Sequence, residues 1–89
     1  MSLNQNWELK IDKIIFKKLS RLPKKDVERI FVTIEFLAQN PYSGDIEKIK
    51  GEDNSWRRRV GNYRIFYDIK QDERIVQVTW VERRTSKTY

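Results

Sequence analysis

The chain has 89 residues, enough for one domain (1–89) near the lower size at which a core holds without disulfides or metals. It has no cysteine and no histidine, which excludes a disulfide framework, a cysteine nucleophile, a conventional catalytic triad and, in effect, a zinc site. Its 19 Lys and Arg residues outnumber 13 acidic residues, for a net charge of +6, and this excess favours a polyanionic partner, either nucleic acid or an acidic protein.

The first half of the chain predicts one strand and two helices. Residues 7–11 alternate apolar and polar side chains, as a half-buried strand does. Asp12 is the expected N-cap of a helix that runs to about Leu22. A second helix spans about 24–39, and its apolar stripe consists of Val27, Ile30, Phe31, Ile34, Leu37 and Ala38. We expect both helices to pack their apolar stripes against a sheet.

A hairpin is predicted in the second half, after a polar connector over 45–53 that could add a short edge strand. The hairpin turns at Gly61-Asn62, a dipeptide typical of two-residue loops because these loops need a positive φ at their centre. The register that follows pairs Val60 with Tyr63, Arg59 with Arg64, Arg58 with Ile65, Arg57 with Phe66 and Trp56 with Tyr67.

This register gathers positive charge on one face of the hairpin. Alternation places Arg57, Arg59 and Arg64 on that face, whereas Arg58 lies on the other face unless the register slips by one residue. Like charges directly opposite one another repel, so the arginines need a compensating anion. Nearby carboxylates or solvent would suffice, and a bound polyanion gripped by the guanidinium forks is the functional alternative.

A third strand of the meander is predicted over 74–81. Its two faces would carry Val76, Val78 and Trp80 on one side and Ile75, Gln77, Thr79 and Val81 on the other. We expect Trp7, Trp56 and Trp80 to lie in the core or at its edge. The predicted fold class is α+β, with two N-terminal helices packed on a twisted, mainly antiparallel sheet in the order β-α-α-β-β-β.

The residues available for chemistry are arginines, carboxylates and tyrosines, a set that suits phosphoryl transfer. RNA supplies its own nucleophile in the 2′-hydroxyl group. A ribonuclease therefore needs only a proton acceptor, cations over the phosphate and a proton donor for the leaving 5′-oxygen. No run of residues spans a membrane and the N-terminus lacks a signal-peptide pattern, so a cytoplasmic protein is expected.

Several segments together resemble the RelE/ParE toxin superfamily. They are 19–23 (LSRLP), 41–45 (PYSGD), 48–51 (KIKG), 56–67 (WRRRVGNYRIFY) and 81–89 (VERRTSKTY). The resemblance covers almost the whole chain, and 56–67 is its most specific part. It implies the same small α+β fold, cleavage of mRNA in the ribosomal A site without cofactor or metal, and a cognate antitoxin protein that wraps the toxin and silences it.

The resemblance also implies roles for four residues. Arg64, in the run Asn-Tyr-Arg, matches the arginine that holds the scissile phosphate. Arg57 and Arg59 stand where prototypical RelE has two lysines, one of which activates the 2′-hydroxyl; with a pKa above about 12, an arginine stabilises charge rather than accepting a proton. Glu47 matches the glutamate of a YoeB-like branch and is the candidate base, and its alternative is a solvated loop carboxylate.

Further candidates lie toward the C-terminus. Arg84 aligns with an arginine proposed as general acid or phosphate clamp, and Tyr89 with a terminal tyrosine that stacks on a base. Tyr89 could instead be an ordinary frayed chain end. The remaining predicted RNA-binding residues are Lys48, Lys50, Arg58, Arg83 and Lys87.

Two alternatives to the ribosome-dependent endoribonuclease remain open. One is a ParE-like toxin that binds DNA gyrase and has the same fold. The other is a catalytically weakened relative that binds an antitoxin and little else, because neither Lys nor His occupies the acid and base positions. The combination of Arg57, Arg59, Arg64, Arg84 and Tyr89 favours the endoribonuclease.

Overall fold

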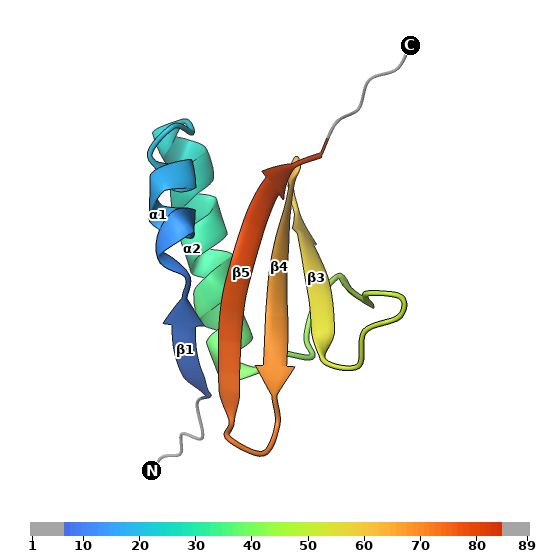
Figure 1. Ribbon diagram of the computed structural model, residues 1–89. Coiled ribbons are helices and arrows are strands. Elements are labelled where there is room, and N and C mark those ends of the chain that lie inside the picture. The colour runs from blue at the N-terminus through green and yellow to red at the C-terminus, as the bar shows by residue number, and fades with distance from the viewer. Residues whose placement is uncertain (1–6, 85–89) are drawn as a thin grey trace.

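The computed structural model describes residues 7–84, which form two helices and five strands (Figure 1). The helices are α1 (Lys13–Leu19) and α2 (Lys24–Gln39), and the strands are β1 (Glu8–Ile11), β2 (Ile46–Lys48), β3 (Ser55–Val60), β4 (Tyr63–Lys70) and β5 (Ile75–Arg83). The strands join in the order β1-β5-β4-β3-β2, and only the β1–β5 pair is parallel. The α+β prediction is confirmed. Within 7–84, no helix has the length and apolar character needed to cross a membrane.

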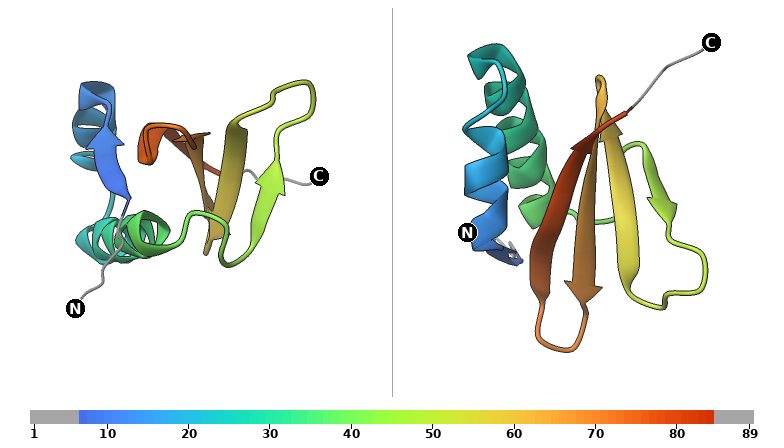
Figure 2. Two further views of the ribbon diagram at one scale, coloured as in Figure 1. Left: turned by 90° about the horizontal axis from the view of Figure 1, so that it is seen from below. Right: turned by 45° about the horizontal axis from the view of Figure 1, so that its top comes forward.

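The two helices lie side by side against one face of the sheet, and no helix or strand of the described segment 7–84 covers the other face (Figures 1 and 2). Burial along β4 alternates strictly, because every second side chain points toward the helices. The core combines the inward faces of both layers: Ile15, Leu19, Ile30, Ile34, Leu37, Tyr63, Ile65, Tyr67, Ile69, Val76, Val78 and Val81. Residues on the open face of β4 are therefore free to serve a site rather than the core.

The start of α1 differs from the prediction in one respect. Asp12 is the N-cap residue, but its side chain makes no capping hydrogen bond. Instead Asp12 Oδ1 accepts a 2.8 Å hydrogen bond from Nε2 of Gln77 on β5. A local capping role is thus replaced by a contact between residues that lie far apart in the chain.

The end of α1 also differs from the prediction. The helix ends at Leu19 rather than near Leu22, and residues 20–22 form a turn in which the N–H groups of Arg21 and Leu22 donate to the carbonyl oxygens of Lys18 and Leu19. Leu22 itself precedes Pro23 and is therefore disfavoured in the helical region. Leu22 is still half-buried against the core, so the predicted apolar stripe holds although the last turn of helix does not form.

The central hairpin has the predicted register. Arg59 pairs with Arg64 and Trp56 pairs with Tyr67, so no one-residue slip occurs. Gly61 has a φ of +56° and is the only one of the two turn residues with a positive φ. This pattern suits a type II′ turn, in which glycine takes the first central position.

Strand β5 contains an irregularity that the sequence pattern did not reveal. Phe66 pairs with Trp80 and Tyr67 pairs with Val78, so Thr79 is an extra residue opposite β4. A bulge of this kind reverses the alternation beyond it. The prediction that Trp80 shares the core face with Val78 is therefore wrong: Trp80 is 38% exposed, and Val81 is buried in its place.

Trp7 and Trp56 lie at the edge of the core, as predicted. Tyr42 stands between them, with its ring centroid 6.2 Å from that of Trp7 and 6.1 Å from that of Trp56, both in edge-to-face geometry. These rings connect the segment after α2 to β3, which helps to hold the neighbouring edge strand β2 in place.

Candidate functional site

Three arginines share the open face of the sheet. Arg57 and Arg59 lie on β3, and Arg64 lies on β4 directly opposite Arg59. They occupy this face because their neighbours along each strand, among them Tyr63 and Ile65, point into the core. The predicted gathering of Arg57, Arg59 and Arg64 is confirmed by the strand register.

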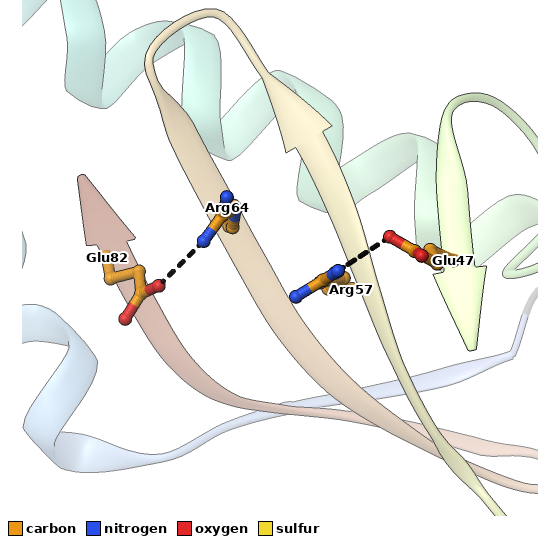
Figure 3. Close-up of polar contacts among 4 residues, drawn as sticks. All are labelled: Glu47, Arg57, Arg64 and Glu82. Carbon is orange, nitrogen blue, oxygen red and sulfur yellow. Dashed lines mark hydrogen bonds and ion pairs between the residues drawn. The ribbon is translucent and has the colours of Figure 1, made fainter. Parts of the chain in front are cut away.

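Two carboxylates flank the arginines, one on each side (Figure 3). Glu47 on β2 pairs with Arg57, and its Oε1 accepts hydrogen bonds of 2.7 Å from Nη2 and 3.1 Å from Nε. Glu82 on β5 pairs with Arg64, and its Oε2 lies 3.3 Å from Nη1. The chain therefore supplies compensating anions for two of the three arginines.

Arg59 differs from its two neighbours. It is exposed, and its guanidinium group makes no hydrogen bond or ion pair with any other residue of the 7–84 segment. Its backbone N–H donates a 3.0 Å hydrogen bond to the carbonyl oxygen of Asp45, which fixes the strand but leaves the side chain available. A small depression lies around it, lined by Asp45, Glu47, Arg57, Arg59 and Arg64.

The arginines change the ionisation of Glu47. The hydrogen bond from Arg57 and the charge of that residue lower the pKa of Glu47, and the charges of Arg59 and Arg64 add to the effect. Glu47 is thus held as a carboxylate, which makes it a weaker proton acceptor than an ordinary glutamate.

Glu82 is the site residue that the sequence did not reveal. The third strand was expected to end at Val81, so the next residue was not assigned to a sheet face. In the structure β5 continues to Arg83, and the bulge at Thr79 places Glu82 opposite Arg64. The alternation of side chains along β5 would have placed Glu82 on the face of Arg64 only if the bulge at Thr79 had been known.

Arg84 lies at the hairpin turn. Its Nη1 donates a 3.2 Å hydrogen bond to the carbonyl oxygen of Gly61, and its backbone N–H donates to the carbonyl oxygen of Asn62. Its Nε is buried and has no hydrogen-bond partner among the residues that the structure describes. Arg84 therefore joins the end of β5 to the turn that precedes Arg64.

The other predicted RNA-binding residues are not brought to the arginine face. Arg58 lies on the helix side of the sheet, where its Nη1 reaches the carbonyl oxygen of Ser43 at 3.5 Å. Arg83 pairs with Tyr63 and stands 6.0 Å from the centre of that ring, also on the helix side.

The three predicted lysines are also apart from the arginines. Lys48 pairs with Trp56 and shares the face of that residue, and Lys50 is exposed in the turn after β2. Lys87, like the predicted stacking residue Tyr89, lies outside the described residues.

The described residues include no group of three or more acidic side chains placed to hold a metal ion. The arrangement that remains is a row of guanidinium groups between two carboxylates on an open sheet. Guanidinium forks match the oxygens of a phosphate, and carboxylates can accept protons. The site can therefore bind a phosphodiester and move a proton beside it.

Comparison with known proteins identifies the family of the chain. The family model described as "ParE toxin of type II toxin-antitoxin system, parDE" matches residues 7–87. A Methanocaldococcus jannaschii protein named as toxin RelE1 is 32% identical over 81 residues, which cover 88% of this chain and 90% of the relative.

Solved structures show the same fold. The toxin chain of the archaeal RelE–RelB complex from Pyrococcus horikoshii OT3 superposes with a TM-score of 0.80 at 24% identity, over 93% of this chain and 100% of that one. The isolated RelE toxin of E. coli gives a TM-score of 0.77 at 17% identity, over 91% and 87%. The chain therefore belongs to the RelE/ParE family and is a RelE-type toxin of a toxin–antitoxin system.

Proposed function

We propose that this toxin is a ribosome-dependent endoribonuclease that cleaves mRNA in the ribosomal A site. The observation that carries the proposal is the row formed by Arg57, Arg59 and Arg64 on the sheet face opposite to α1 and α2. Such a row can hold a phosphodiester and stabilise the charge that develops when the 2′-oxygen attacks phosphorus.

Each arginine has a distinct part in this proposal. Arg64 holds the scissile phosphate, and Arg57 and Arg59 neutralise its oxygens. The guanidinium groups thus provide the charge stabilisation, and the proposed reaction uses no metal ion. Arg84 would meet the same phosphate or the leaving oxygen after releasing the Gly61 carbonyl. The product would be a 2′,3′-cyclic phosphate and a free 5′-hydroxyl. Because the ribosome orients the mRNA, we expect little cutting of free RNA.

The proposal includes an antitoxin partner in the cytoplasm. RelE is found with RelB in the Pyrococcus horikoshii complex and in a Methanococcus jannaschii complex whose toxin superposes with a TM-score of 0.68 at 32% identity. We propose that an antitoxin binds this chain as well and silences it. Co-expression with the neighbouring reading frame, followed by co-purification, tests this part independently of any catalytic assay.

A second function has one observation in its favour. The description of the matching family model names the ParE toxin. The alternative function is therefore the ParE-like one, inhibition of DNA gyrase. Gyrase inhibition would not require the row of arginines to contact RNA. Supercoiling by purified gyrase in the presence of the toxin is the direct measurement.

Primer extension on a reporter mRNA in a translating extract tests the endoribonuclease. The wild-type protein should produce discrete cuts in A-site codons, and Arg64→Ala should abolish them. Arg21→Ala removes the same charge from an exposed position between the helices and should leave the cuts unchanged. Intact mRNA with gyrase inhibited would support the ParE-like function, and intact mRNA without toxicity would indicate a protein that only binds its antitoxin.

A further inference from the structure

The two carboxylates beside the arginine row are held very differently. Oε1 of Glu47 accepts two hydrogen bonds from Arg57, at 2.7 and 3.1 Å. Glu82 receives a single contact from Arg64 at 3.3 Å, which is long for a charge-assisted hydrogen bond. Glu47 is thus held by two hydrogen bonds from one arginine, whereas Glu82 is held by one long contact; in both residues the second carboxylate oxygen has no hydrogen bond or ion pair within 7–84.

The two carboxylates also differ in their position relative to Arg64. Glu82 stands directly opposite Arg64 on the adjacent strand. Glu47 lies on β2, with β3 between it and β4, so two interstrand spacings of about 4.8 Å separate the backbones of Glu47 and Arg64. Only Glu82 is an immediate neighbour of the arginine to which the phosphate is assigned.

We propose that Glu82 is the catalytic residue that accepts the proton of the attacking 2′-hydroxyl group. This inference rests on the proposed endoribonuclease function and on the placement of the phosphate at Arg64. In RNA the 2′-oxygen is separated from phosphorus only by C2′, C3′ and O3′. An acceptor for its proton must therefore stand beside the residue that holds the phosphate, and Glu82 does.

The proposed step is balanced in atoms and charge. A carboxylate oxygen of Glu82 takes the 2′-hydroxyl proton, the 2′-oxygen forms a bond to phosphorus, and the bond from phosphorus to the 5′-oxygen breaks. The leaving 5′-oxygen takes a proton from water, and Glu82 returns its proton to solvent. The phosphate, by engaging Arg64, also replaces the anionic partner that Arg64 loses when Glu82 is protonated.

This role explains how a site with arginines in place of lysines can still contain a base. Arginine remains charged at every accessible pH, so none of the three arginines can accept a proton. Glu47 is a weak acceptor because the hydrogen bond and charge of Arg57 lower its pKa. Of the two carboxylates that pair with the arginines, the loosely held Glu82 is therefore the better proton acceptor.

The experiment is single-turnover cleavage of an A-site codon on purified, programmed ribosomes. Glu82→Gln should slow cleavage by about 10²–10⁴-fold, the usual contribution of a general base, and Glu82→Asp should restore part of the rate. Glu47→Gln should lose less than Glu82→Gln does. Glu35→Gln removes a carboxylate from the exposed side of α2 and serves as the charge-matched control with the wild-type rate.

A binding measurement separates catalysis from positioning. Ribosomes programmed with mRNA that has a 2′-deoxynucleotide at the cleaved position bind the toxin but cannot be cut. Glu82→Gln should bind them as tightly as the wild-type protein, or more tightly, because it removes an anion that competes for Arg64. Weaker binding in proportion to the lost rate would overturn the proposal in favour of a structural role.

Two further outcomes distinguish the inference from the proposed function. If the wild-type protein cuts and Glu82→Gln cuts at the same rate, the endoribonuclease stands and the assignment of Glu82 is wrong. If the wild-type protein cuts no codon under any condition, the proposed function fails and the assignment fails with it.

Discussion

Tyr63 Oη donates a 2.7 Å hydrogen bond to Asp26 Oδ2 and so joins β4 to the first turn of α2. Tyr63 is only 4% exposed and immediately precedes Arg64 in the chain. The bond therefore anchors the strand that carries the proposed phosphate-binding arginine, from the opposite face of the sheet.

Tyr63→Phe should destabilise the fold by about 1.5–3 kcal/mol, the range for a hydrogen bond to a charged group. Urea denaturation, fitted with one m-value for the wild-type protein and the variant, measures the change in the free energy of unfolding. Tyr42→Phe is the matched control, because the Tyr42 ring is 44% exposed and its hydroxyl has no hydrogen-bond partner within 7–84. Equal losses in the two variants would contradict the importance of the Asp26 contact.

Stability should fall at alkaline pH because of two tyrosines. The hydrogen bond to Asp26, followed by burial, raises the pKa of Tyr63 above its usual value of 10.0, and burial raises the pKa of Tyr67 further. A group whose pKa is higher in the folded state than in the unfolded state makes its full contribution to stability at pH values below the unfolded-state pKa. That contribution is lost as the pH rises from there through the folded-state pKa. We expect the loss to begin above pH of about 10.

The alkaline loss is measured by the midpoint of urea unfolding at pH 8 to 11 for the wild-type protein and Tyr67→Phe. The variant should be less stable at pH 8, because the buried hydroxyl of Tyr67 donates a 2.8 Å hydrogen bond to the carbonyl oxygen of Pro41. The stability of Tyr67→Phe should nevertheless fall less steeply with rising pH than that of the wild-type protein. If the stability of the two proteins fell in parallel with pH, the pKa of Tyr67 would be the same in the folded and unfolded states, which would contradict the prediction.

Gly44 and Gly51 provide a matched pair for the role of Arg58. Both have nearly the same positive φ, +86° and +85°, so alanine costs a comparable backbone strain of about 1 kcal/mol at each. At Gly44 a new Cβ would collide with the guanidinium group of Arg58, whereas at Gly51 it would enter open space.

Gly44→Ala should therefore be more destabilising than Gly51→Ala, by up to about 1 kcal/mol, because the displaced Arg58 loses its contacts to backbone carbonyl oxygens. Thermal unfolding would show this as a larger fall in Tm. In an Arg58→Ala background the difference between the two glycine variants should vanish, and a persistent difference would locate the strain elsewhere.

Arg59 should contribute more to the salt dependence of RNA binding than Arg57 does. Arg57 already has Glu47 as a partner, whereas the exposed Arg59 has no ion pair among the described residues. Arg59→Gln should reduce the slope of log K against log salt by about 0.7, the value for one contact to single-stranded nucleic acid. Arg57→Gln should change it less.

This slope is obtained from fluorescence anisotropy of a 2′-O-methyl oligonucleotide at several salt concentrations. Arg21→Gln, at an exposed position away from the sheet, controls for net charge alone. Equal slopes for all three variants would mean that the RNA senses only the overall charge of the protein and not the row of arginines.

The arginine row could be deduced from the sequence because every determinant of it is local. Gly61 sets the turn, the turn sets the register, and alternation then assigns Arg57, Arg59 and Arg64 to one face. The helices were likewise visible in their apolar periodicity, which depends on neighbours within a few residues.

Only the tertiary structure decided the other half of the site. The bulge at Thr79, the exposure of Trp80 and the position of Glu82 opposite Arg64 all depend on how β5 packs beside β4. The contact of Asp12 with Gln77 and the parallel pairing of β1 with β5 also join distant segments of the chain. Turn and strand patterns encode the pairing of neighbours in sequence, but a bulge forms to satisfy packing across the whole sheet, and no short window of sequence contains that information.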